Sequence, residues 1–263
     1  MFLLAVIAAV FALALIVAMI GNIVGIGGGV INVLFLIYIF RLNPLDAAGL
    51  SLIAIVFSSL SGFIQDMRKL LVDMKLFAVI GSIAVLGSVI GSIVTTYISP
   101  GIFKGVFSII VIFIGIFSIY STHAQTRGGV EYYRDAGDHL KETGILSLVA
   151  GVISGFMGIG IGGIMGTYLT AVRRVKPKIA FATIIAAMLP VSTVGATIHF
   201  YYTGLESVYL APSLITGAMI GAVLGSRIIS RAPQAKLRFF QGYVIIAFGT
   251  LSAILFLLTT HQI

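Results

Sequence analysis

Apolar residues fill long stretches of this chain, and short polar segments separate the stretches at fairly regular intervals. The stretches are residues 1–40, 44–65, 76–98, 102–120, 144–172, 177–202, 209–229 and 239–258. Most contain about 20 residues, which is the length that a helix needs to cross the hydrocarbon core of a bilayer. The pattern therefore predicts an all-α integral membrane protein.

Two of these stretches are interrupted by clusters of glycine at matching points in the two halves of the chain. The first cluster is GNIVGIGGG at residues 21–29, and the second is GFMGIGIGG at residues 155–163. Glycine allows the backbone to leave the helical conformation, and irregular backbone is tolerated at membrane depth only around a protected cavity. Interrupted segments in corresponding positions of two repeats are typical of the binding site of a secondary transporter.

Glycine, serine and proline also recur in the same order in both halves. At one constant spacing, Gly21, Gly87, Gly91 and Ser92 match Gly155, Gly221, Gly225 and Ser226, and a slip of one residue matches Pro44 with Pro177. This ordered series predicts two membrane repeats, residues 1–120 and 144–263, joined by a polar linker at residues 121–143.

The distribution of basic residues predicts how the repeats are oriented. Lys and Arg gather at residues 66–75 in the first half and at residues 173–178 and 227–238 in the second half, whereas residues 203–208 contain none. If the linker lies on the same side, nearly all of the 16 Lys and Arg residues face one compartment, as the positive-inside rule favours. We therefore expect a multi-pass protein of the plasma membrane with a cytoplasmic linker.

This orientation forces the segment 144–172 to enter and leave the membrane on one face. Split at its glycines, the segment provides limbs of about 11 or 12 residues, which reach roughly half of the membrane thickness. We expect a re-entrant helical hairpin here, and a hairpin from the opposite face within residues 1–40, although the first 20 residues are long enough to span. Each repeat then has one broken element and three transmembrane helices, an odd number that inverts one repeat against the other.

Composition supports the membrane class and excludes several kinds of site. The chain is 59% hydrophobic and 9% charged with a mean hydropathy of +1.17, and it contains no cysteine, which excludes disulfides and thiolate metal sites. The net charge of +8 lies in short loops, where topology explains it better than nucleic-acid binding does. We expect no cofactor, no metal and no nucleic acid; the expected partners are the lipid bilayer and a small anionic substrate.

Taken together, the motifs resemble the TauE/SafE sulfite exporter family, also called the sulfonate or sulfite permease family. The resemblance covers essentially the whole chain, through the glycine motif at residues 25–29, its counterpart at residues 158–163, the proline-led second helix of each half and the Gly-xxx-Gly-Ser ending of each third helix. It implies a secondary transporter of sulfite, organosulfonates or related small organic anions, with export as the favoured direction. Spacing and composition alone show no sulfur chemistry.

The residues themselves are compatible with a small anion held by backbone groups. Broken helices that meet near the bilayer midplane present N–H groups and the positive ends of helix dipoles, which bind anions without a buried basic residue. Polar side chains on the second helix of each half, together with Asn22, complete the predicted pocket. The candidate binding residues are Asn22, Gly25, Gly27, Gly28, Gly29, Ser51, Ser58, Gly158, Gly160, Gly162, Gly163, Ser192 and His199.

Structural explanations compete with binding for several of these residues. Helix-borne hydroxyl groups often bond backbone carbonyls or cross to a neighbouring helix, and His199 stands near a helix end, where we expect an interfacial histidine. The spaced glycines of each third helix predict close helix packing rather than binding. They are Gly81, Gly87, Gly91, Gly217, Gly221 and Gly225.

Other functions compete with transport. A passive anion channel would share the backbone-lined site and stays open as an alternative. An enzyme would need a nucleophile and a base, and the pair Ser154 and His199 has no orienting third residue, so we expect no catalytic residues. We expect no buried acidic residue, which argues against a carboxylate proton relay and leaves uniport, potential-driven export or sodium coupling open. The exact substrate, the direction of transport and the oligomeric state, a homo-oligomer included, also stay open.

Overall fold

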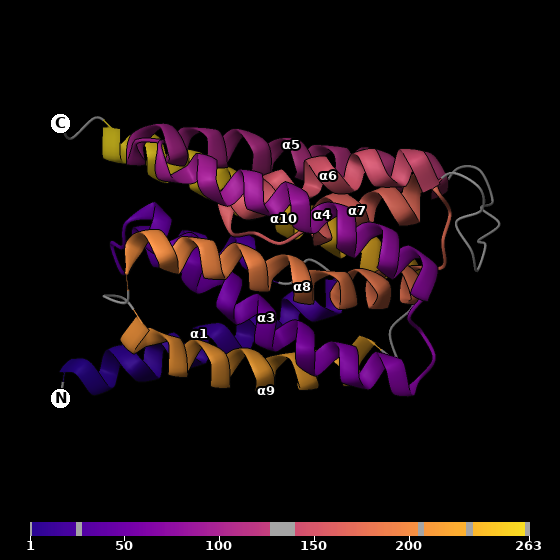
Figure 1. Cartoon of the computed structure of the whole chain (residues 1–263), viewed down its shortest axis with the longest axis horizontal. Helices are drawn as coiled ribbons and strands as arrows, with labels where there is room; N and C mark the ends of the chain where they lie inside the picture. The colour runs from indigo at the N-terminus through magenta and orange to yellow at the C-terminus, as the bar shows by residue number, and fades with distance from the viewer. Residues whose placement is uncertain (1, 25–27, 127–139, 205–207, 230–233, 261–263) are drawn as a thin grey trace.

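The computed structural model describes residues 2–24, 28–126, 140–204, 208–229 and 234–260, which form helices joined by short connections without a β-strand among them (Figure 1). In chain order the helices are α1 (Phe2–Val24), α2 (Gly29–Tyr38), α3 (Pro44–Arg68), α4 (Met74–Thr96), α5 (Pro100–Thr126), α6 (Leu140–Met157), α7 (Gly162–Thr167), η1 (Tyr168–Val172), α8 (Pro177–Thr203), η2 (Val208–Leu210), α9 (Ala211–Ile229) and α10 (Gln234–Thr260). The all-α prediction is confirmed.

Five helices in the described part of the chain are long and apolar enough to cross a membrane, namely α3, α4, α6, α8 and the 100–120 part of α5. Helices α3 and α8 are the most buried of the five, and each begins with the expected proline, Pro44 and Pro177. Large apolar side chains such as Ile109 and Phe113 on α5 are exposed, as expected of helices that face lipid.

The second half folds back on itself at the expected place. Helix α6 runs inward, the chain turns at residues 158–161, and α7 with η1 returns to the end where α6 began and α8 starts (Figure 1). A salt bridge of 3.5 Å between Arg173 and Glu142 joins the ends of the two limbs. The expected length of the first limb is wrong, because α6 has 18 residues and continues through Gly155 to Met157.

Helices α1 and α2 form the corresponding hairpin in the first half. The start of α1 packs on the start of α9, where a Cβ atom on Gly217 would lie 2.5 Å from the carbonyl oxygen of Phe11. The end of α2 reaches the start of α5, where the Lys104 ammonium lies 5.5 Å from the Tyr38 ring centroid. The two hairpins therefore open toward opposite ends of the bundle (Figure 1).

The glycines of α4 and α9 pack closely against the hairpin helices. A Cβ atom on Gly87 or Gly91 would overlap the backbone carbonyls of Leu148 or Val152 on α6. Gly217, Gly221 and Gly225 meet the backbone of α1 in the same way. Close packing is thereby confirmed for these five glycines. The same prediction is wrong for Gly81, because a Cβ atom there would have the Pro190 side chain, at 3.8 Å, as its nearest neighbour.

Candidate functional site

The two broken segments meet inside the bundle. The first break ends at Gly28, whose φ of 76° requires glycine, and α2 starts at the next residue. The second break contains Gly158 and Gly160 with φ of 72° and 75°. A Cβ atom on Gly29 would lie 2.5 Å from the carbonyl oxygen of Ile159, so the backbones of the two breaks are in direct contact.

Ser51, in the middle of α3, links the two breaks. Its hydroxyl lies 2.7 Å from the carbonyl oxygen of Gly158 and 3.3 Å from that of Gly29, and its side chain is fully buried. One hydroxyl proton is shared between two carbonyls that belong to different halves of the chain. This candidate residue is thus placed at the centre of the predicted site.

The other candidate glycines are buried around the same point. Gly28 packs against Val17, Gly158 against Ala48 and Gly160 against the side chains of Ile55 and Met188, with the closest hypothetical Cβ contacts at 2.7, 2.6 and 3.3 Å. Gly162 and Gly163 form the first turn of α7. Gly25 and Gly27 lie outside the described residues.

Two small cavities adjoin the breaks on the side of α10. One touches Gly28 and the other touches Gly160 and Gly163, and both are lined by Val30 and Ile245. Their walls are mainly aliphatic. The first turn of a helix carries N–H groups without an intrahelical acceptor, so the start of α2 can supply the polar contacts that these walls lack.

Three of the remaining candidates bond backbone carbonyls, as the structural alternative expects. Ser58 donates to Ile55 in its own helix at 3.1 Å, and the Asn22 amide donates to Ala18 at 3.0 Å. His199 Nε2 lies 2.7 Å from the Gly155 carbonyl oxygen. The interfacial expectation for His199 is wrong, because the end of α6 covers this side chain and leaves it 0% exposed.

His199 belongs to a polar seam that sequence reasoning recognised only in part. The polar seam consists of Ser88, Ser92, Thr95, Ser154, Ser192 and His199. Ser92 donates to the Gly155 carbonyl at 3.3 Å, and Thr95 donates to the Phe156 carbonyl at 2.8 Å. The hydroxyls of Ser154 and Ser192 are buried without a hydrogen-bond partner in the described structure. The helical spacing of the three α4 residues was the signal available in the sequence.

A pocket opens where α3 and α9 end and α8 begins. Its polar lining comes from Asn22, Asp66, Lys69, Lys178 and Ser226, and its apolar lining comes from Leu71, Phe181, Ala182 and Ile185. Next to it, Ser226 donates a hydrogen bond to the Gln65 amide oxygen. Among the predicted binding residues that the structure describes, only Asn22 lines this pocket.

Asp66 contradicts the expectation that the chain has no buried acidic residue. The sequence assigns residue 66 to a basic loop, but α3 continues to Arg68, and α8 and α9 leave Asp66 only 6% exposed. Within the described structure its carboxylate makes no hydrogen bond or ion pair. Burial of this residue depends on packing between helices that are distant in sequence.

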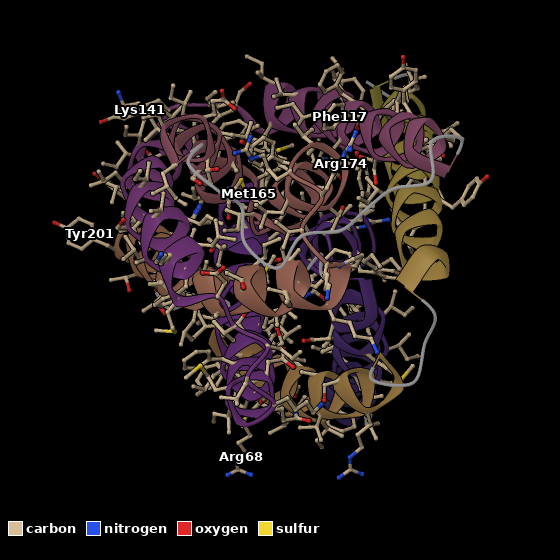
Figure 2. All side chains as sticks on the ribbon, turned by 90° about the vertical axis from the view of Figure 1, so that its right-hand side faces the viewer. Arg68, Phe117, Lys141, Met165, Arg174 and Tyr201 are labelled. Atoms are coloured by element: carbon tan, nitrogen blue, oxygen red, sulfur yellow. The ribbon has the colours of Figure 1, made fainter. Side chains whose placement is uncertain are left out.

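Basic residues surround the mouth of this pocket and the open ends of α6 and η1. Figure 2 looks onto this face, with Arg68 and Lys141 labelled at its rim and Arg174 labelled within it. We call this face the basic end; it also carries Lys69, Lys75, Arg173, Lys176, Lys178 and Arg227. In Figure 1 it is the right-hand end.

Comparison with known proteins places this arrangement in a family. The model of the family "Sulfite exporter TauE/SafE" matches residues 10–251. The chain belongs to the TauE/SafE sulfite exporter family. No solved structure matches this TauE/SafE protein.

Two bacterial relatives extend the comparison. This TauE/SafE protein is 25% identical over 221 residues to the "Probable membrane transporter protein YdhB" of Bacillus subtilis, covering 82% of this chain and 87% of the relative. It is 28% identical over 245 residues to the "Probable membrane transporter protein YunE" of the same organism, covering 85% of this chain and 88% of the relative. The family and both names support a multi-pass membrane transporter.

The geometry of Ser154 and His199 gives no support to an enzyme. His199 directs Nε2 to the Gly155 carbonyl, and no hydrogen bond joins it to the Ser154 hydroxyl in the described structure. A serine nucleophile needs such a contact with its base. The TauE/SafE family is a family of transporters, which favours transport over catalysis.

Proposed function

We propose that this TauE/SafE protein is a secondary transporter that exports sulfite, organosulfonates or related small anions by alternating access. The observation that carries the proposal is the contact between the two breaks, with Ser51 bonded to both Gly29 and Gly158. Such a contact places irregular backbone from both halves at one point of the bundle, where a transporter of this kind holds its substrate.

An inverted repeat is part of the proposal. The hairpin helix of each half packs on the third helix of the other half, in the pairs α1 with α9 and α6 with α4. Corresponding helices also pack on each other, in the pairs α3 with α8 and α5 with α10. Exchanging the halves leaves this set of pairs unchanged, as a two-fold axis in the membrane plane requires. The repeats span residues 1–120 and 144–263.

The anion would bind where the breaks adjoin the first turns of α2 and α7. N–H groups and the helix dipole favour negative charge at such a point. No arginine or lysine lines the two small cavities beside the breaks. A backbone-lined site suits a carrier, because it binds an anion without holding it by a strong ion pair.

The basic end would face the cytoplasm of the cell, together with the linker at residues 121–143. The positive-inside rule supports this orientation. The pocket at Asn22 and Ser226 opens toward this end. A carrier that takes up its substrate from inside would use such a pocket for entry.

Flux into liposomes that contain the purified protein tests this function. Sulfite, thiosulfate, methanesulfonate and acetate would be offered one at a time, and we expect saturable flux of the sulfur anions above that of acetate. Preloaded unlabelled substrate should accelerate uptake of labelled substrate, because a carrier returns loaded faster than empty. Flux that does not saturate and shows no such counterflow would instead identify a channel.

A further inference from the structure

The pocket at the basic end is lined by one carboxylate and by two ammonium groups, which can attract an anion. Asp66 lines the pocket together with Lys69, which caps the end of α3, and Lys178 on α8, and the Asn22 amide and the Ser226 hydroxyl complete the polar lining. Asp66 is 6% exposed, and its carboxylate makes no hydrogen bond or ion pair among the described residues. Structural carboxylates that are this buried are normally paired. The Asp66 carboxylate lines the pocket, where solvent or a bound ligand can reach it.

The charges in the pocket explain what Asp66 can do. The two ammonium groups attract an anion in the pocket, and the ionised carboxylate repels it from a similar distance. Among the described residues, Asp66 is the only acidic one that lines the pocket. The elements packed around it present Asn22 from α1, Lys178 from α8, and Ser226 with its exposed neighbour Arg227 from α9. One proton on Asp66 therefore changes the pocket from one negative and two positive groups to two positive groups alone.

We propose that this pocket is an anion-binding site on the path to the breaks, and that Asp66 couples anion binding there to the uptake of one proton. The proton comes from solvent at the basic end and converts the Asp66 carboxylate into a neutral carboxyl group. Lys69 and Lys178 provide the attraction, and the Asn22 amide, which donates one N–H to the Ala18 carbonyl, has a second N–H for the anion oxygens. The inference rests on the proposed transport function and adds a coupling ion to it.

Thermodynamic linkage makes the coupling reciprocal. If protonation of Asp66 strengthens anion binding, then a bound anion strengthens proton binding by the same factor. The apparent affinity for an anion of fixed charge must then fall as the pH rises through the range in which Asp66 loses its proton. The expected slope is at most about tenfold per pH unit, which corresponds to one proton taken up per anion.

Calorimetric titration of the purified full-length protein with methanesulfonate tests this coupling. The probe keeps one negative charge between about pH 5 and pH 8, so any pH dependence belongs to the protein. Titration in two buffers of different ionisation enthalpy measures the protons taken up on binding. We expect proton uptake and falling affinity for the native chain, and neither for Asp66→Asn.

Matched variants separate coupling from damage to the fold. Asp66→Glu should keep the pH dependence, and Asp73→Asn should behave like the native chain, because Asp73 caps α4 from outside the pocket. Lys178→Gln should weaken methanesulfonate binding about tenfold, the loss expected for one charge-assisted contact.

Three results would contradict different parts of the proposal. If Asp66→Asn, folded by its thermal transition, keeps the native proton uptake and pH slope, the coupling inference is wrong while the transport proposal stands. If Lys178→Gln binds methanesulfonate as the native chain does, the anion does not occupy this pocket. If the native chain binds no sulfur anion at all, the proposed function itself fails.

Discussion

The pocket at the basic end and the polar seam near the opposite end occupy corresponding positions of the two halves, and they differ in what fills them. At the constant spacing of the repeat, Gln65 and Ser226 of the pocket match His199 and Ser92 of the seam. In the pocket, Ser226 bonds Gln65 directly. In the seam, His199 and Ser92 both bond the carbonyl of Gly155, so α4, α6 and α8 are held together.

Two further pairs account for the difference in access. Asn22 and Asp66 of the pocket match Phe156 and Phe200, which lie next to seam residues in the sequence. The Phe156 ring packs 5.4 Å from the Phe103 ring, and Phe200 packs against the buried core. Aromatic rings thus fill the space near one end, whereas polar side chains line a pocket near the other. The proposed alternating access would require such a difference in any single conformation.

Labelling of single cysteines gives the largest expected contrast between the two ends, because it is all or none. Lys176 at the basic end and Tyr201 at the opposite end are both exposed, and the chain has no cysteine of its own. In intact cells we expect a membrane-impermeant maleimide to label Tyr201→Cys, and to label Lys176→Cys only after permeabilisation. Labelling of both from one side would contradict the proposed orientation.

Gly91→Val should strongly destabilise the packing of α4 on α6 at the closed end. A Cβ atom at this position overlaps the backbone of Val152, which cannot move aside as a flexible side chain could. We expect a loss of more than about 3 kcal/mol in the free energy of unfolding, at the upper end of overpacking effects. Gly101→Val is the control, because a Cβ atom there has no neighbour within 4 Å. Equal thermal stability of the two variants would show that α4 and α6 are not closely packed.

The sequence predicted those features that depend on local chemistry. Helices α3 and α8 begin at Pro44 and Pro177 because proline suits the first helical position, where no N–H group is needed. The hairpin of the second half followed from charge, since two basic segments flank one apolar stretch. Close packing at Gly87 and Gly91 followed from small-residue spacing.

Features that depend on contacts between distant helices could not be predicted in this way. The burial of Asp66 is produced by α8 and α9, and that of His199 by the end of α6. The role of Ser51 depends on two carbonyls from different halves of the chain. In each case the sequence shows the residue type, but only tertiary packing determines which residues contact it.

Phe156→Ala should open the closed end at a moderate cost. Removing the ring leaves a void beside Phe103, and we expect a loss of about 2 kcal/mol, below the usual value for a water-soluble core because lipid is itself apolar. A cysteine at Ser192 in the seam should then react faster with an impermeant reagent added from the Tyr201 side. Phe113→Ala serves as control, since this ring is 70% exposed on α5. An unchanged labelling rate would mean that Phe156 does not close the path.

Ser51→Ala should have the smallest effect on stability and a larger one on transport. The substitution removes one shared hydrogen bond and leaves two buried carbonyls without this donor, which costs about 1 kcal/mol. Ser58→Ala is the matched control on the same helix, because Ser58 bonds only the Ile55 carbonyl of its own turn and joins no second element. If the contact between the breaks forms the binding site, Ser51→Ala lowers the affinity for sulfur anions about tenfold, whereas Ser58→Ala leaves it unchanged. Equal affinities in the two variants, measured as anion-dependent thermal stabilisation, would move the binding site away from the breaks and toward the pocket at the basic end.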